Sequence, residues 1–84
     1  MEIVFHRQFK KSLKKLPVKV HHQFYERLEL FMEDDIHPTL NNHSVDKAFV
    51  GCRSINVTGD YRAIFHEEKG IITFVAIGTH SELY

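Results

Sequence analysis

The second half of the sequence contains three strand-like segments separated by connections of only three residues. The segments span residues 49–57, 61–67 and 71–77, and the connections are Thr58-Gly59-Asp60 and Glu68-Lys69-Gly70. A parallel crossover needs about a dozen residues or more, so connections this short make consecutive strands antiparallel neighbours. The sequence therefore predicts an antiparallel sheet formed by the second half of the chain.

The first half begins with a strand-like segment, residues 2–5, followed by two amphipathic helices. A helix of about ten residues is predicted by apolar residues at helical spacing, namely Phe5, Phe9, Leu13 and Leu16. A second helix, running to about Asp34, is predicted by a similar series, Val20, Phe24, Leu28, Phe31 and Met32. Pro17 suits the start of that helix, and so short a link predicts an antiparallel helical hairpin.

These elements give an α+β fold with the order β-α-α-β-β-β. We expect a small, curved, mainly antiparallel sheet with the helical hairpin on one face, and we expect the other face to be open to substrate. Residues 35–47, which contain His43, are rich in turn formers and are predicted to form one long loop.

Length and composition favour one globular domain, residues 1–84, with a reducing, cytoplasmic location. The chain has 84 residues, a single cysteine, and no apolar stretch like a signal peptide or a membrane span. Its net charge is zero, but residues 1–19 carry six cations against one acid, whereas residues 26–35 carry five acids against one cation. One end of the molecule is therefore expected to be basic and another acidic.

The seven histidines supply the side chains best suited to proton transfer near neutral pH. Adjacent His21 and His22 point about 100° apart on a helix, and His6, His37 and His66 have adequate roles as ordinary polar residues. No pair has the i, i+4 spacing of a helical zinc site, so no metal or other cofactor is indicated. On the residues alone, His43 and His80 are ordinary loop residues too.

Residues 50–65 and the final Gly78-Thr79-His80-Ser81-Glu82-Leu83-Tyr84 together resemble the C-terminal half of RelE/ParE-superfamily toxins. The closest resemblance is to the YafQ-like ribosome-dependent mRNA endonucleases. It is strong from about His43 onward, and before that residue it rests on the order of the elements. The resemblance implies a RelE-like fold and a type II toxin that cuts mRNA in the ribosomal decoding site. The implied partners are a cognate antitoxin, the ribosome and mRNA.

The resemblance also implies roles for particular residues. The implied catalytic residues are His43, Asp60, His80 and Arg62. The implied substrate-binding residues are Arg53, Asn56, Tyr61 and Tyr84, the last as an aromatic on which a base stacks. Ribosomal RNA is expected to contact the basic first helix through Lys10, Lys11, Lys14 and Lys15, which otherwise form a solvated helix face.

Two departures from the YafQ-like pattern leave other functions open. Asn56 stands where those toxins carry a histidine, and Ala76 stands where they carry an arginine, a charge that Arg62 could replace. The alternatives are a ParE-like protein that inhibits DNA gyrase by binding, and a catalytically weak relative that binds only its antitoxin. Two histidines and an aspartate argue against the first alternative, because binding alone does not require proton carriers.

Overall fold

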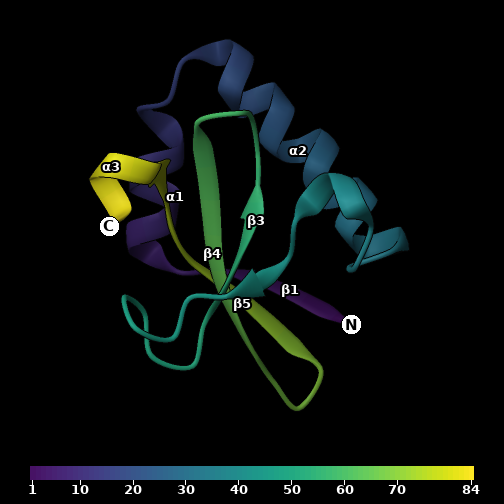
Figure 1. Ribbon diagram of the computed structural model, residues 1–84. Helices are drawn as coiled ribbons and strands as arrows, with labels where there is room; N and C mark the ends of the chain where they lie inside the picture. Colours follow the sequence, from purple (N-terminus) through teal and green to yellow (C-terminus); the bar gives the residue numbers. More distant parts are fainter.

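The computed structural model describes residues 1–84 and has an α+β fold (Figure 1). Its elements in chain order are β1 (Glu2–Phe5), α1 (Arg7–Lys14), α2 (Val18–Glu33), a 3-10 turn (Pro38–Leu40), β2 (His43–Ser44), β3 (Arg53–Asn56), β4 (Tyr61–Glu68), β5 (Ile71–Thr79) and α3 (His80–Leu83). The predicted class and the predicted order are confirmed, with three additions: the 3-10 turn, β2 and α3. None of the helices combines the length and the apolar composition that a membrane span requires.

The five strands form one mixed sheet in the order β1-β5-β4-β3-β2. The pairs β3–β4 and β4–β5 are antiparallel, as their short connections predict; the pair β2–β3 is also antiparallel, and β1 is parallel to β5. Lys69 and Gly70 form the tight turn between β4 and β5, with φ angles of +53° and +80°. Two positive φ angles at the tip of a hairpin are typical of a turn whose twist matches that of its strands.

A β-bulge divides β5 into two parts. Phe65 pairs with Phe74 but Ile64 pairs with Ala76, so Val75 is an extra residue on β5. Because of the bulge, both Phe74 and Ile77 reach the core although they are three residues apart. A bulge also bends its strand. The second part of β5 thus leads away from β1, which pairs only with residues 71–74.

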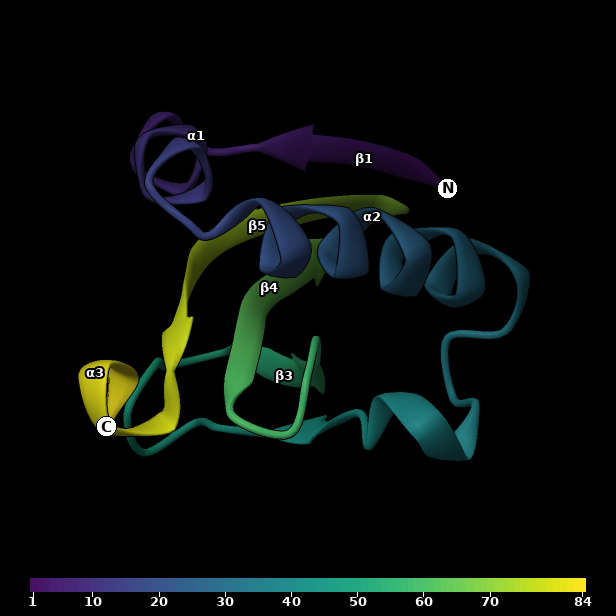
Figure 2. The same cartoon turned by 90° about the horizontal axis from the view of Figure 1, so that it is seen from above.

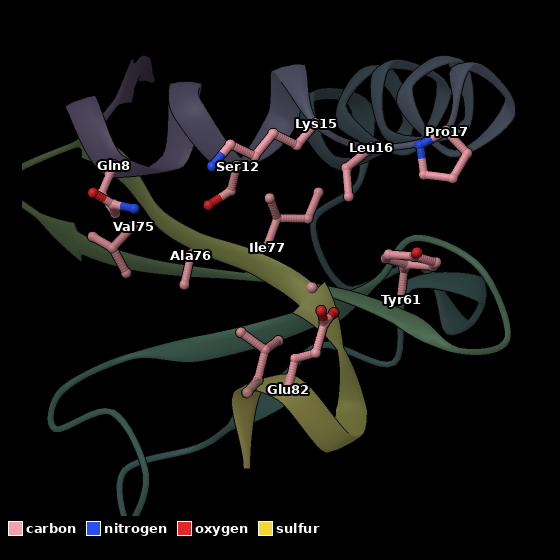
Figure 3. Close-up of a pocket in the computed structure, with 12 residues that line it drawn as sticks. Gln8, Ser12, Lys15, Leu16, Pro17, Tyr61, Val75, Ala76, Ile77 and Glu82 are labelled. Atoms are coloured by element: carbon pink, nitrogen blue, oxygen red, sulfur yellow. The ribbon is translucent and has the colours of Figure 1, made fainter.

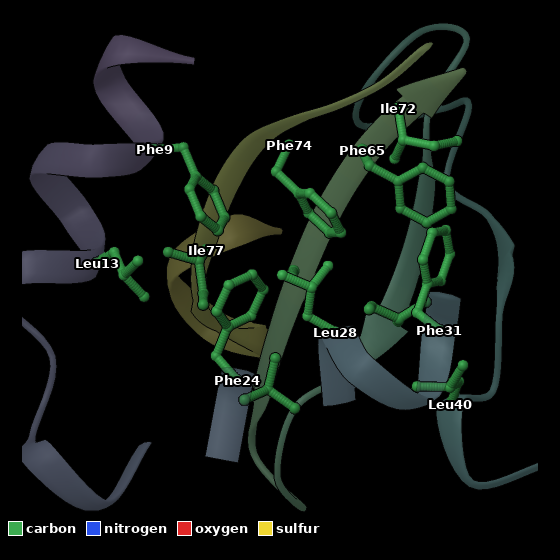
Figure 4. Packing of buried hydrophobic residues seen from close by; sticks show 13 residues of the cluster. Phe9, Leu13, Phe24, Leu28, Phe31, Leu40, Phe65, Ile72, Phe74 and Ile77 are labelled. Carbon is green, nitrogen blue, oxygen red and sulfur yellow. The ribbon is translucent and has the colours of Figure 1, made fainter. Parts of the chain in front are cut away.

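The hydrophobic core lies between the helices and one face of the sheet, and Phe74 is at its centre (Figure 4). The ring of Phe74 packs at centroid distances of 5.5–6.0 Å against five other phenylalanines: Phe5, Phe9, Phe24, Phe31 and Phe65. Offset and edge-on aromatic pairs of this kind add about 0.5–1.5 kcal/mol each beyond the burial of their area. This cluster fixes the helices on the sheet.

The two helices cover one face, as predicted, but they cross instead of lying side by side. In Figure 2, α1 is seen end-on while α2 is seen lengthwise. Each helix has its own apolar residues for the sheet, Phe9 and Leu13 on α1 and Phe24, Leu28 and Phe31 on α2. Packing each stripe on the sheet, rather than on the other helix, accounts for this departure from a regular hairpin.

The other face of the sheet is more covered than expected. Ser54 and Ile64, which point away from the helices, have no exposed surface. Residues 45–52 fold back over this face in a turn closed by a hydrogen bond from the Val45 N–H to the Cys52 carbonyl, 3.0 Å. α3 lies on the same side (Figure 2). The ring of Tyr84, which follows α3, has its centroid 6.3 Å from that of Phe49.

The predicted loop at residues 35–47 and the predicted strand at residues 49–57 both need correction. The loop contains the 3-10 turn and β2, whereas the strand begins only at Arg53. Gly51 has a φ of +73°, and its N–H donates to Asp46 Oδ1 at 2.6 Å. The turn that these contacts hold takes up the residues that were expected to start the strand.

Candidate active site

A cavity of about 360 Å³ opens on the face of the sheet opposite the main helices. It is lined by Asn41, His43, Val45, Arg62, His80 and Tyr84. These residues come from the segment around β2, from β4 and from α3. The fold thus brings together around one cavity three of the four residues predicted to be catalytic, His43, Arg62 and His80, together with the predicted stacking residue Tyr84.

His43 is exposed and begins β2, where it pairs with Ser54 of β3. Its Nδ1 lies 2.7 Å from the backbone oxygen of Asn41. A carbonyl oxygen can only accept a hydrogen bond, so Nδ1 carries the proton, and in the neutral ring Nε2 keeps a free lone pair. His43 is therefore held in the tautomer in which Nε2 can accept a proton.

Arg62 is half-buried on β4, and its guanidinium is anchored at one end. Nη1 donates to the backbone oxygens of Thr58, Gly59 and Tyr61 at 3.1, 3.2 and 3.1 Å, all at the turn between β3 and β4. The other guanidinium nitrogens, Nε and Nη2, make no recorded hydrogen bond. Arginine binds phosphate well through two such N–H groups. Arg62 thus combines a fixed position with free donors.

His80 begins α3 and Tyr84 directly follows its last residue, one helical turn from His80, and the centroids of the two rings are 4.8 Å apart. The Tyr84 N–H donates to the His80 carbonyl at 3.0 Å, and the His80 N–H donates to the Asp60 carbonyl at 3.1 Å. Both side chains are exposed. The helix therefore presents an imidazole and an aromatic ring together at the cavity.

A capping box starts α3. Thr79 Oγ1 accepts from the Glu82 N–H at 3.2 Å, and the Thr79 N–H donates to Glu82 Oε1 at 2.7 Å. The hydrogen bond from the Thr79 backbone, followed by that of its side chain, lowers the pKa of Glu82 below its ordinary value of 4.5. The Thr-x-x-Glu pattern of residues 79–82 is the sequence signal from which this helix could have been predicted.

Gly78 allows α3 to fold close to β5. A Cβ at this position would lie 3.1 Å from Glu82 Oε1 and 3.6 Å from Leu83 Cδ2. The first distance is tighter than about nine in ten real Cβ contacts, and the atom that would have to move is the oxygen that caps Thr79. A side chain at residue 78 would therefore disturb the helix that carries His80.

The other four predicted catalytic and substrate-binding residues, Tyr61, Arg53, Asp60 and Asn56, do not line this cavity. Tyr61 packs against the core on the helix-covered side, because side chains alternate along β4 and Arg62 takes the other face. Arg53 donates from Nε to Asn42 Oδ1 at 2.7 Å and is thereby held away from the cavity. Asp60 adjoins His80 through the backbone, but its carboxylate makes no recorded hydrogen bond to either imidazole.

Asn56 pairs with Arg62 across β3 and β4 and so shares its face of the sheet. Its Oδ1 is buried without a hydrogen-bond partner, and Asn56 does not line the cavity. The four predicted RNA-contacting lysines are exposed on α1, on the other side of the sheet from the cavity. None of these lysines lines the cavity.

A second cavity, also of about 360 Å³, lies between α1, the second part of β5, and α3 (Figure 3). Gln8, Ser12 and Lys15 line it from α1, and Tyr61 and Glu82 line it from the opposite side. Beyond Phe74 no strand pairs with this side of β5. The cavity thus borders an open sheet edge and contains no histidine. Nowhere in the structure do three histidine, cysteine or acidic side chains group as metal ligands do.

Solved structures share this fold over nearly the whole chain. YafQ from E. coli strain BL21(DE3) is 22% identical, with a TM-score of 0.81, and the match covers 99% of this chain and 97% of that one. The YoeB/ParE toxin from Agrobacterium tumefaciens is 8% identical, with a TM-score of 0.75 and coverages of 95% and 99%. Comparison with curated protein sequences gives no match. The chain therefore shares its fold with the YafQ and YoeB/ParE toxins of known structure.

A family model identifies the chain more closely. The model for YafQ, described as a bacterial toxin of a type II toxin-antitoxin system, matches residues 1–84. The chain belongs to this family. Related toxins have also been solved with partners: YafQ in the E. coli DinJ-YafQ toxin-antitoxin complex is 22% identical, with a TM-score of 0.75 and coverages of 99% and 96%.

Proposed function

We propose that this toxin is an endoribonuclease that cuts mRNA on the ribosome by metal-independent acid-base chemistry. The observation that carries the proposal is the convergence of His43, His80 and an anchored Arg62 on one cavity. Two proton carriers beside one phosphate-binding cation are what cleavage of RNA through its own 2′-hydroxyl requires.

The tautomer of His43 suggests how the two histidines divide their roles. With Nδ1–H bonded to the Asn41 carbonyl, the His43 Nε2 takes the proton from the 2′-hydroxyl. The 2′-oxygen then attacks the phosphorus and the bond to the 5′-oxygen breaks. His80, in its protonated form, gives a proton to that leaving oxygen. The products are a 2′,3′-cyclic phosphate and a 5′-hydroxyl, and water can restore both histidines to their starting forms.

The remaining residues hold the substrate. Arg62 binds the scissile phosphate through its free Nε and Nη2 donors, and its anchoring means that little freedom is lost on binding. Tyr84, 47% exposed and beside His80, stacks on a base next to the cut, an interaction worth about 1–3 kcal/mol. We also propose Asp60 as a catalytic residue and Asn56 as a substrate-binding residue. Asp60 adjoins His80 through the backbone, and Asn56 pairs with Arg62 across the sheet.

The ribosome supplies the positioning that so small a domain lacks. The cavity is open and six residues line it, so it cannot by itself hold an mRNA strand in register. The exposed lysines of α1 lie on the other side of the sheet, where they can contact ribosomal RNA while the cavity faces the message. A cognate antitoxin neutralises the toxin. The proposal of this partner is supported by the E. coli DinJ-YafQ complex and the Staphylococcus aureus YoeB-YefM complex.

Mapping of mRNA 5′ ends after brief expression from a tightly controlled promoter tests the proposal. We expect cuts in phase with codons and 5′-hydroxyl ends, which are lost in His80→Ala and Arg62→Met. His22→Ala, which removes an exposed histidine of α2, is the matched control and should cut normally. DNA damage with intact mRNA would instead identify a gyrase inhibitor. Normal growth with soluble, folded toxin would identify an inactive antitoxin-binding relative.

A further inference from the structure

Arg53 and Asn42 form a hydrogen-bonded cluster next to the cavity but outside it. The Arg53 guanidinium donates from Nε to Asn42 Oδ1 at 2.7 Å and from Nη2 to the Asn42 backbone oxygen at 3.3 Å. Asn42 Nδ2 in turn donates to the backbone oxygen of Asp35 at 2.8 Å. Asn42 is therefore fixed at its side-chain oxygen, its side-chain nitrogen and its backbone.

Asn42 lies in the chain between Asn41 and His43, whose contact determines the tautomer of His43. The peptide bond that precedes Asn42 carries the Asn41 carbonyl, whose oxygen lies 2.7 Å from His43 Nδ1. Asn41 has the left-handed conformation, with φ +46° and ψ +49°, which few residue types other than glycine adopt readily. The orientation of this carbonyl thus depends on an unusual backbone turn that the fixed Asn42 side chain holds.

The backbone alone gives this segment little support. β2 has two residues and is an edge strand of the sheet, held only by its pairing with β3. Arg53 is the residue of β3 that pairs with Ser44, so its side chain reaches Asn42 from the neighbouring strand. The rigid, planar guanidinium holds this forked contact to two oxygens of one residue in a fixed geometry, which a flexible lysine ammonium does not provide.

We propose that Arg53 is a positioning residue that acts through Asn42 to hold the Asn41 carbonyl against His43 Nδ1. It thereby keeps Nε2 of His43 as the proton-accepting nitrogen. The effect of this arrangement on cleavage rests on the proposed function, whereas the tautomer of His43 does not. In this role Arg53 contacts the loop that carries the general base, and it makes no contact with the substrate.

Nitrogen-15 NMR of the histidine side chains tests the proposal without any RNA. We expect the folded wild type to show His43 protonated at Nδ1 in its neutral form. Arg53→Lys keeps the charge but lacks the fork, and Asn42→Ala removes the acceptor, so both should shift His43 towards the other tautomer. Arg7→Lys, at an exposed site on α1, is the matched control and should leave the tautomer of His43 unchanged. If His43 keeps its Nδ1 proton in both folded variants, the proposal is overturned.

Cleavage kinetics give a second, separable readout. A positioning role predicts that Arg53→Lys lowers kcat about 10- to 100-fold with little change in KM, as misplaced catalytic groups do. A phosphate contact predicts the opposite pattern, a raised KM that the lysine largely rescues, and that result would overturn the proposal. Failure of the wild type to cleave any mRNA would refute the proposed function, and the NMR result would still decide whether Arg53 positions His43.

Discussion

Replacing Thr79 by alanine should loosen α3 without destabilising the rest of the domain. The substitution removes the oxygen that accepts the Glu82 N–H at 3.2 Å. α3 has four residues and none of them is buried, so its cap is a large share of what holds it in place. Loss of an N-cap costs about 1 kcal/mol, which corresponds to a change of about fivefold in the equilibrium between the docked and the frayed helix.

Amide hydrogen exchange measures this change directly. The Tyr84 N–H donates to the His80 carbonyl within α3, so its exchange should become about fivefold faster. Amides of β4 such as that of Phe65 should keep their rates, because they open only when the whole domain unfolds. Thr39→Ala is the matched control, since the Thr39 side chain makes no recorded hydrogen bond. Unchanged exchange at Tyr84, or equal acceleration at Tyr84 and Phe65, would show that the cap does not hold this helix separately.

The remaining predictions concern the core, the glycine beside α3, the cap and the cysteine. Phe74→Ala should lower the free energy of unfolding by about 3–5 kcal/mol, measured by denaturant titration; a loss below 1 kcal/mol would show that the phenylalanine cluster does not carry the core. Gly78→Ala should displace the Glu82 carboxylate from Thr79 and return the Glu82 pKa towards 4.5, as followed by NMR titration; an unchanged pKa would mean that the side chain adapts. Folding lowers the pKa of Glu82, so the stabilisation from the ionised carboxylate is fully present above pH 4.5. It is lost as the pH falls through the pKa that Glu82 has in the folded protein. Amide exchange at Tyr84 should accelerate over that pH range. Burial, and secondarily Asp46, raises the pKa of the Cys52 thiol, so alkylation at neutral pH should be slow until the protein unfolds; rapid alkylation of folded protein would contradict the burial.

Much of the fold follows from local features of the sequence. The connection Glu68-Lys69-Gly70 predicts an antiparallel hairpin, and the structure has its turn at Lys69 and Gly70. The capping signal at Thr79 and Glu82 shows that α3 could have been predicted too. By contrast, the segment from Phe74 to Ile77 is continuously apolar and does not indicate the bulge at Val75. With or without a bulge, an apolar residue would face the core at each position.

The candidate site was predictable only in part. Side chains alternate along β4, which places Tyr61 with Ala63 and Phe65 on the core face. The same alternation places Arg62 on the opposite face. The sequence could therefore have predicted that Tyr61 does not share a cavity with Arg62. The meeting of His43 and His80 depends on strand order across the sheet, which no local pattern contains. The family resemblance, and no local pattern, therefore indicates this pair of histidines. The hydrogen bonds that hold Arg53 to Asn42 were likewise hidden, because they join residues eleven positions apart.

The parallel pairing of β1 with β5 has a consequence for biosynthesis. Residues 2–5 are made before every other strand, whereas their partners, residues 71–74, belong to the strand that is made last. β5 and α3 also carry the central ring of the aromatic cluster and two residues of the cavity. Nascent chains that lack these segments can neither complete the sheet nor assemble the cavity. The order of the strands thus delays any toxic activity until translation of the domain is nearly finished.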